Sequence, residues 1–135
     1  MSLRPSPPIV LIVDDNMLTL LYITEFLKLL GCEPLTLGDG VDVTEMVKKC
    51  RPALVLMDLY MPGISGFDAV RNLKADAETK DVPVYAFTAL DPKKLADNPD
   101  MKLFSGILPK ASKIESLKQV LEAVGVILTQ KSSIA

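Results

Sequence analysis

Short apolar runs alternate five times with longer amphipathic segments between residues 9 and 124, and this alternation restricts the chain to few folds. The apolar runs have the length of strands and the amphipathic segments that of helices, which is typical of βα units around a parallel sheet. Strands are expected over Ile9–Val13, Glu33–Leu37 and residues 53–57, 82–87 and 105–108. The first, third and fourth runs are nearly all apolar, so we expect them at the centre of the sheet, covered on both faces.

Five helices are expected to follow these strands, over residues 16–30, 39–50, 65–75, 92–98 and 112–124. In the second helix, apolar side chains recur with helical spacing at Val43, Met46, Val47 and Cys50. Ser112, followed three residues later by Glu115, predicts a capping box at the start of the last helix. The fourth helix is short and polar and lies between Pro92 and Pro99, so we expect it to be mobile.

The length of 135 residues suits one domain with one core, and 49% hydrophobic with 24% charged residues is typical of a folded globular protein. Residues 1–8 contain three prolines and no periodic pattern, which predicts a disordered leader or linker. We therefore expect the folded domain to span residues 9–128 and a C-terminal tail to span residues 129–135.

Several classes of function are disfavoured by composition. A net charge of −2 lacks the positive surface with which dedicated nucleic-acid binders displace counterions. No apolar stretch reaches the roughly 18–20 residues of a membrane span, and the start of the chain lacks a signal-peptide pattern, so a cytoplasmic protein is expected. The absence of histidine excludes a Ser/His/Asp triad, a histidine-ligated zinc and a phosphohistidine carrier.

Acidic residues follow two of the apolar strands at the point where each ends. Asp14 and Asp15 come directly after Ile9–Val13, and Asp58 comes directly after residues 53–57. The carboxyl ends of strands in an open parallel sheet border the crevice where ligands bind. Clustered carboxylates there repel one another unless a cation joins them, and Mg²⁺ binds one or two acids while keeping several waters. The simpler alternatives are a helix cap at Asp14 or Asp15 and a turn at Asp58.

A hydroxyl and an ammonium group complete the set. Thr88 ends the fourth predicted strand, and Lys110 follows the fifth. Either residue alone is more often structural. Together with three acids at the same edge, they predict a cation and phosphoryl site in which Asp58 is the nucleophilic carboxylate.

Over about residues 9–124 the sequence resembles the receiver domain of bacterial response regulators, the CheY-like family of two-component signalling. The resemblance rests on Val13-Asp14-Asp15-Asn16, on Met57-Asp58-Leu59-Tyr60-Met61-Pro62-Gly63 with Gly66, on Thr88-Ala89 and on Pro109-Lys110. It implies a flavodoxin-like, doubly wound α/β fold, in which five helices cover both faces of a five-stranded parallel sheet of order 2-1-3-4-5.

The resemblance also implies a role for each site residue. Asp58 would accept a phosphoryl group from the phosphohistidine of a sensor histidine kinase or phosphotransfer protein. Asp15, Asp58 and the Tyr60 backbone carbonyl would bind Mg²⁺ directly, with Asp14 acting mainly through water. Thr88 and Lys110 would contact the phosphoryl oxygens. The domain would not be an enzyme acting on other substrates, but would assist its own phosphorylation and dephosphorylation. Phosphorylation would alter the surface of the fourth helix, fifth strand and fifth helix, which a downstream target or effector domain reads.

Two departures keep an alternative open. Ile107 stands where the family usually has an aromatic residue, and Ala111 stands where it usually has a proline after a cis bond. A degenerate receiver used only as an interaction module is therefore a second hypothesis. An aspartyl-phosphate phosphatase of the haloacid-dehalogenase type is a third, although such enzymes have an acid where this chain has Tyr60. Tyr60 and Leu90 are bulky residues near the expected path of hydrolytic water, which predicts slow self-dephosphorylation.

The first predicted helix has more apolar surface than packing on a sheet requires. Its apolar residues span an arc of roughly 200° and are Leu18, Leu20, Tyr22, Ile23, Phe26, Leu27, Leu29 and Leu30. We expect part of this arc to be a docking surface for a kinase or phosphotransfer partner or a homodimer contact; the alternative is a broad core face.

Overall fold

The computed structural model describes residues 6–126 and residue 128. Residues 1–5 of the expected leader and the whole expected tail over residues 129–135 lie outside the described residues. The strands are β1 (Ile9–Val13), β2 (Glu33–Leu37), β3 (Leu54–Met57), β4 (Val84–Thr88) and β5 (Gly106–Pro109). They form one parallel sheet in the order β2-β1-β3-β4-β5, which confirms the predicted topology.

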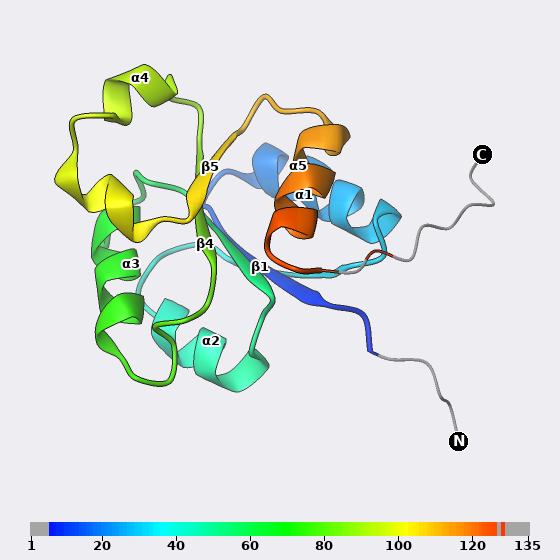
Figure 1. Cartoon of the computed structure of the whole chain (residues 1–135), viewed down its shortest axis with the longest axis horizontal. Coiled ribbons are helices and arrows are strands. Elements are labelled where there is room, and N and C mark those ends of the chain that lie inside the picture. The colour runs from blue at the N-terminus through cyan, green and yellow to red at the C-terminus, as the bar shows by residue number, and fades with distance from the viewer. Residues whose placement is uncertain (1–5, 127, 129–135) are drawn as a thin grey trace.

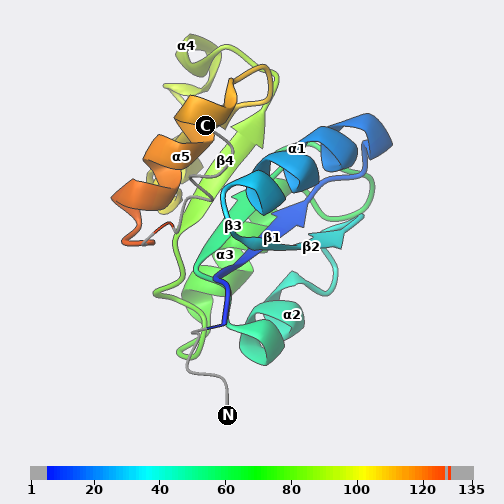
Figure 2. The ribbon, with the colours of Figure 1, turned by 90° about the vertical axis from the view of Figure 1, so that its right-hand side faces the viewer.

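Helices cover both faces of this sheet (Figures 1 and 2). Their bounds are α1 (Met17–Leu29), α2 (Val43–Cys50), α3 (Gly66–Ala75), α4 (Pro92–Leu95) and α5 (Ile114–Ala123), with a 3₁₀ helix η1 at Pro99–Leu103. Polar side chains cap the first turns of α1 and α3. The Asn16 side chain accepts a hydrogen bond from the Thr19 amide at 3.0 Å, and Ser65 accepts one from the Asp68 amide at 3.2 Å.

Residues on β1 and β3 alternate between two apolar layers, as the period of a strand requires. Leu11, Val13, Val55 and Met57 face the layer that α2, α3 and α4 cover, which contains Val43, Val47, Phe67, Val70, Leu73 and Leu95. Val10, Ile12, Leu54 and Leu56 face the layer that α1 and α5 cover, which contains Ile23, Leu27, Leu117, Val120 and Leu121. All residues of β3, and all residues of β1 except Ile9, are buried, as predicted for a doubly wound sheet.

The predicted capping box at Ser112 is wrong. Helix α5 begins at Ile114, with Lys113 at its N-cap, and no side chain caps it. The reason is a tight turn after β5, in which the Ser112 amide donates to the Pro109 carbonyl at 3.0 Å. This turn places Ser112 one position too early to act as the cap, while Glu115 still lies in the first turn, where a carboxylate favours the helix dipole.

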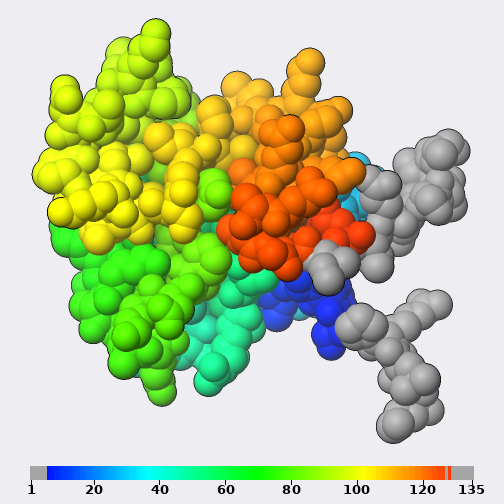
Figure 3. Space-filling view, viewed as in Figure 1, coloured from blue at the N-terminus to red at the C-terminus, as the bar shows by residue number. Residues whose placement is uncertain are grey.

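The helix predicted over residues 92–98 is shorter than expected, and a separate 3₁₀ helix follows it. Helix α4 ends at Leu95, and η1 begins at Pro99 with the Asn98 side chain accepting from the Asp100 amide at 2.9 Å. A proline in the first turn of each piece explains the division, because its ring suits a helix start but not a helix interior. In the space-filling view α4 projects from the body of the molecule (Figure 3).

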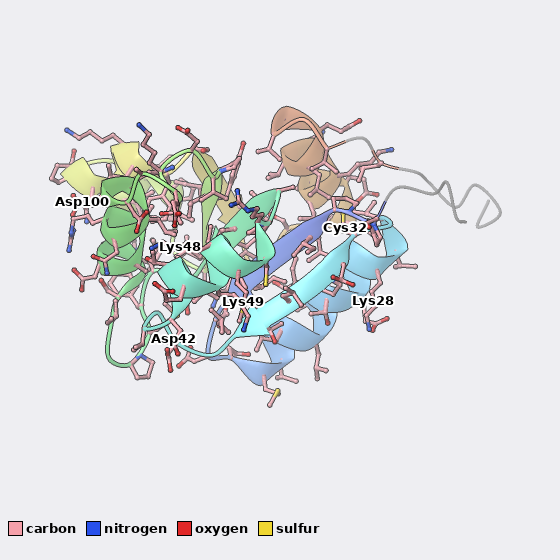
Figure 4. The ribbon with its side chains drawn as sticks, turned by 90° about the horizontal axis from the view of Figure 1, so that it is seen from below. Lys28, Cys32, Asp42, Lys48, Lys49 and Asp100 are labelled. Carbon is pink, nitrogen blue, oxygen red and sulfur yellow. The ribbon has the colours of Figure 1, made fainter. Side chains whose placement is uncertain are left out.

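Helix α2 is tied to the chain that follows α3 by an ion-pair cluster on Lys48. Its ammonium lies 2.9 Å from Asp76 Oδ2, 3.6 Å from Glu78 Oε2 and 3.7 Å from Glu45 Oε1. Figure 4 labels Lys48 on α2 in the view from below. The hydrogen bond from Lys48 lowers the pKa of the Asp76 carboxyl below its ordinary value. None of the helices in the described part of the chain has the length and apolar composition needed to cross a bilayer.

The broad apolar arc predicted on α1 divides into a buried part and an exposed part. Ile23, Leu27 and Leu30 belong to the core. Leu20, Tyr22 and Phe26 are half-buried against it, so these positions are not open docking surface. The exposed apolar side chains of the helix are Met17, Leu18, Leu21 and Leu29, with exposed fractions of 71%, 76%, 58% and 50%. Met17 and Leu21 were not in the predicted surface.

Candidate functional site

Sheet register brings Asp14 and Asp58 together at the carboxyl edge. Val13 on β1 pairs with Met57 on β3, so the residues that follow them emerge side by side. The Asp58 amide donates to the Val13 carbonyl at 2.9 Å, which extends the ladder by one bond. The adjacency that the sequence pattern predicted is therefore a direct consequence of how these two central strands pair.

Three carboxylates converge at this point, and burial distinguishes them. Asp14 is fully buried and Asp58 is 6% exposed, whereas Asp15 is exposed. One oxygen of each of the three lies within 4.8 Å of the others. Asp14 Oδ1 accepts a hydrogen bond from the Asn16 amide at 2.8 Å, which orients that carboxylate toward the start of α1. The arrangement offers oxygen ligands from two strand ends to a single cation.

Lys110 reaches the acidic cluster from the neighbouring strand pair. Thr88 pairs with Pro109, and the Lys110 amide donates to the Thr88 carbonyl at 2.8 Å, which places the lysine directly beyond β5. Its ammonium lies 2.8 Å from Asp14 Oδ2 and 3.5 Å from Asp58 Oδ2. It also lies 5.8 Å from the centre of the Phe87 ring. One lysine thus contacts both buried carboxylates.

The charges at this site are unbalanced in favour of a divalent cation. Three carboxylates against one ammonium leave two negative charges uncompensated. Asp14 Oδ2 is buried and has no hydrogen bond of acceptable geometry, although the Lys110 ammonium lies at 2.8 Å. This oxygen therefore has an ion-pair contact with Lys110 and, with two lone pairs, retains capacity to accept a further partner. A buried carboxylate oxygen with spare acceptor capacity and excess negative charge fits Mg²⁺, either directly or through water.

The pKa of the Asp58 carboxyl is raised above its ordinary value. Burial is the main cause; the Lys110 ammonium opposes it, and the charge of Asp14 adds to it. The surroundings of Asp58 therefore disfavour the charged form of its carboxyl group. Such a group is well suited to gain a cation or an electrophile as a partner.

Thr88 has a buried hydroxyl group at the end of β4, beside Lys110. The residue is 2% exposed, and its Oγ1 accepts a hydrogen bond from the Leu90 amide at 3.1 Å. This bond uses an oxygen lone pair and leaves the hydroxyl proton available to donate. Thr88 and Lys110 line a hollow of about 450 Å³, together with Asn16, Thr19, Tyr22, Ala89, Pro109 and Ala111.

Tyr60 lies in the loop after Asp58 and is 60% exposed. Its amide points at Asp58 Oδ1 over a long 3.5 Å, and its ring contacts the edge of Phe67 at 6.1 Å between centroids. The structure therefore places the Tyr60 backbone beside the Asp58 carboxylate. A role of its carbonyl as a metal ligand remains a prediction.

Gly66 supports the site although no role was predicted for it. A Cβ atom at this position would lie 2.1 Å from the Asp58 carbonyl oxygen and 2.9 Å from Leu59 Cα. The Gly66 amide donates to the Leu59 carbonyl at 2.9 Å. Helix α3 thus begins in direct contact with the Asp58 peptide, and only a glycine allows that approach.

Tyr22 is a second contact that sequence reasoning missed. Its hydroxyl donates to the backbone carbonyl of Lys110. Burial, and to a lesser extent the charge of Asp14, raises the pKa of the Tyr22 phenol, so the hydroxyl stays protonated and can donate. The sequence placed Tyr22 on an expected docking surface because an apolar arc does not reveal a long-range hydrogen bond.

Peptide bonds in the described residues are all trans, including the bond from Lys110 to Ala111. Ile107 is half-buried against the α2–α3 apolar layer. The two departures from the family pattern are therefore accommodated by an ordinary backbone and an ordinary apolar contact.

The fold and the site together define a doubly wound α/β protein with a cluster of three acids and a lysine at the carboxyl edge of its sheet. Residues 10–122 match the family of response regulator receiver domains. Protein PilH of Pseudomonas aeruginosa is 39% identical over 82 residues, which is 61% of this chain and 68% of PilH. The polar-differentiation response regulator DivK of Brucella anthropi is 34% identical over 83 residues, which is 62% of this chain and 68% of DivK.

Solved structures agree with this relationship. The receiver domain of a Pseudomonas aeruginosa sensor histidine kinase, which has a magnesium ion in its active-site cleft, has a TM-score of 0.80 and 26% identity to this chain. The match covers 88% of this chain and 98% of that receiver domain. The chain belongs to the response regulator receiver family, the CheY-like signalling domains of two-component systems.

Proposed function

We propose that this domain accepts a phosphoryl group on Asp58 from the phosphohistidine of a sensor histidine kinase or phosphotransfer protein. In the transfer, a carboxylate oxygen of Asp58 forms a bond to phosphorus while the bond from phosphorus to the histidine nitrogen breaks and its electron pair stays on the imidazole. The observation that carries the proposal is the Lys110 ammonium in contact with the carboxylates of both Asp14 and Asp58.

Mg²⁺ would be held by Asp15, Asp58 and the Tyr60 carbonyl, with Asp14 acting mainly through a water molecule. When bound, the ion would neutralise charge on the transferring phosphoryl oxygens. The support is the cluster of three carboxylate oxygens within 4.8 Å and the unused lone pair of Asp14.

Thr88 and Lys110 would contact the phosphoryl oxygens after transfer. The Thr88 hydroxyl has a proton to donate, and the Lys110 ammonium already lies 3.5 Å from Asp58 Oδ2. Donors that are in place before the reaction stabilise developing negative charge at little reorganisation cost. The new phosphoryl charge would then alter the surface of α4, β5 and α5, which a downstream target or effector domain would read.

The partner kinase or phosphotransfer protein would dock beside the acidic pocket. Three of the exposed apolar side chains, Met17, Leu18 and Leu21, lie on the first half of α1, directly after the Asp14–Asp15 pair. Tyr60 is exposed on the neighbouring β3–α3 loop. An apolar surface around an acidic pocket suits a partner that presents a phosphohistidine from an apolar helix face. We place this event in the cytoplasm, with residues 9–128 as the receiver domain, and retain homodimer formation as a further use of the same surface.

Incubation with acetyl phosphate and Mg²⁺, followed by intact mass measurement, tests the proposal. The wild type is expected to gain one phosphoryl group, and Asp58→Asn none. Asp81→Asn, which alters an exposed carboxylate before β4, serves as the matched control and should behave as the wild type. A wild type that gains no phosphoryl group would contradict the proposal and favour the degenerate-receiver alternative. Equal gain by Asp58→Asn would place the acceptor elsewhere.

A further inference from the structure

The backbone of Lys110 is held from two different elements. Its amide donates to the Thr88 carbonyl at 2.8 Å, which ties it to β4. Its carbonyl accepts from the Tyr22 hydroxyl, which ties it to α1. The peptide group at the base of the lysine side chain is therefore fixed by the strand edge on one side and by a helix on the other.

Other restraints on this loop are few. The Ser112 amide donates to the Pro109 carbonyl at 3.0 Å, but α5 begins without a side-chain cap. Among the described residues, the Tyr22 bond is the only hydrogen bond from a side chain to the backbone of residues 110–113. Removing it would leave the backbone of this loop without a hydrogen bond to α1.

Tyr22 is itself rigidly placed. Its ring meets Phe26 edge-on, with 5.6 Å between centroids and 70° between planes. The next residue, Ile23, is buried in the core and fixes the rotation of α1. The Tyr22 ring also lines the hollow beside Thr88 and Lys110. A half-buried phenol with a fixed ring is a precise anchor, because little rotamer freedom is lost when its hydroxyl bonds.

We infer that Tyr22 is a positioning residue for Lys110: its hydrogen bond to the Lys110 carbonyl holds the loop so that the ammonium reaches Asp14 and Asp58 together. Lysine is a long and flexible side chain, so the direction of its head depends on how firmly its backbone is held. The two ammonium distances, 2.8 Å to Asp14 Oδ2 and 3.5 Å to Asp58 Oδ2, leave little room for displacement. The consequence for phosphoryl transfer rests on the proposed function, whereas the effect on Lys110 itself does not.

The test uses Tyr22→Phe, which removes only the hydroxyl, and Tyr85→Phe as the matched control. Tyr85 is a half-buried tyrosine on β4 whose hydroxyl makes no hydrogen bond within the described residues. The first readout is the pair of amide NMR signals of Lys110 and Ala111, recorded without Mg²⁺ or phosphodonor. Tyr22→Phe is expected to shift these signals and speed their hydrogen exchange more than Tyr85→Phe does. Both variants are expected to melt within a few degrees of the wild type.

The second readout is the rate of phosphoryl gain from acetyl phosphate at saturating Mg²⁺. Tyr22→Phe is expected to slow it by about 2- to 10-fold, the effect of one neutral hydrogen bond, and Tyr85→Phe to leave it unchanged. Amide signals and rates that match those of Tyr85→Phe would overturn the inference. If the wild type gains no phosphoryl group, the proposed function fails, and the Lys110 and Ala111 signals alone decide whether Tyr22 positions the lysine.

Discussion

Replacing Gly66 with alanine tests the contact between the start of α3 and the backbone of Asp58 and Leu59. A Cβ atom would lie 2.1 Å from the Asp58 carbonyl oxygen and 2.9 Å from Leu59 Cα, and both obstacles are backbone atoms that cannot rotate away. Because nonbonded heavy atoms pack at about 3.5–4.0 Å, the start of the helix must retreat by roughly 1.5 Å. Overpacking of this kind costs about 1–3 kcal/mol, and the weakened bond from the Gly66 amide to the Leu59 carbonyl costs about 1 kcal/mol more.

Helix propensity opposes this steric cost, so the sign of the change in unfolding free energy shows which of the two effects is larger. Alanine is favoured over glycine by about 1 kcal/mol in a helix, which would stabilise the variant if space allowed. The steric cost exceeds that gain, and we expect a net loss of about 1–3 kcal/mol. An unfolding entropy of about 2.1 cal/mol/K per residue makes each kcal/mol worth about 3.5 °C here, so Tm should fall by about 4–10 °C.

Thermal unfolding followed by circular dichroism measures this change, with Gly38→Ala as the matched control. A Cβ atom at Gly38 meets nothing within 4 Å, so the control should stay within about 0.5 kcal/mol of the wild type. Gly66→Ala should also gain a phosphoryl group more slowly, because the Asp58 backbone is displaced. A Gly66→Ala variant that melts at or above the wild-type temperature would refute the reasoning.

Three further predictions concern charge, hydrolysis and a buried hydroxyl. Because the pKa of Asp58 is raised in the folded protein, its stabilising contribution is present at acid pH and is lost as pH rises through the folded pKa. In metal-free buffer, Asp58→Asn should therefore raise Tm at pH 7, and this gain should shrink toward pH 4. Melting curves recorded across this pH range measure the effect. Tyr60→Asn should shorten the phosphoaspartate lifetime several-fold by opening a path for water; an unchanged lifetime by intact mass would contradict this idea. Thr79→Val should cost about 1–3 kcal/mol in urea unfolding, because the buried Thr79 hydroxyl donates to the Leu73 carbonyl at 2.7 Å. Thr24→Val, which removes an exposed bond to Leu21 at 3.0 Å, should cost much less.

The central strands and the meeting of acids at their ends could be predicted because both follow from short-range pattern and sheet topology. Asp14 and Asp58 each mark the carboxyl end of a buried apolar strand, and parallel strands have their carboxyl ends at the same edge of the sheet. Because Val13 pairs with Met57, the residues that follow them, Asp14 and Asp58, must lie side by side.

Features that depend on tertiary contact were not predicted. The tight turn after Pro109 decides where α5 begins, and the spacing of Ser112 and Glu115 does not contain that information. Tyr22 reads as part of an apolar arc, yet its hydroxyl bonds a residue 88 positions away. The exposed apolar side chains of α1 likewise depend on how the helix rotates against the sheet, which a wide apolar arc leaves undetermined.

The most direct test of the central claim is a crystal structure of the domain with Mg²⁺ and beryllium fluoride, an analogue of the phosphoryl group. We predict the analogue on a carboxylate oxygen of Asp58, within hydrogen-bond distance of the Thr88 hydroxyl and the Lys110 ammonium, with Mg²⁺ on Asp15 and Asp58. An analogue bound away from Asp58, or a metal ion held by other acids, would contradict the claim that these strand ends enclose one phosphoacceptor pocket.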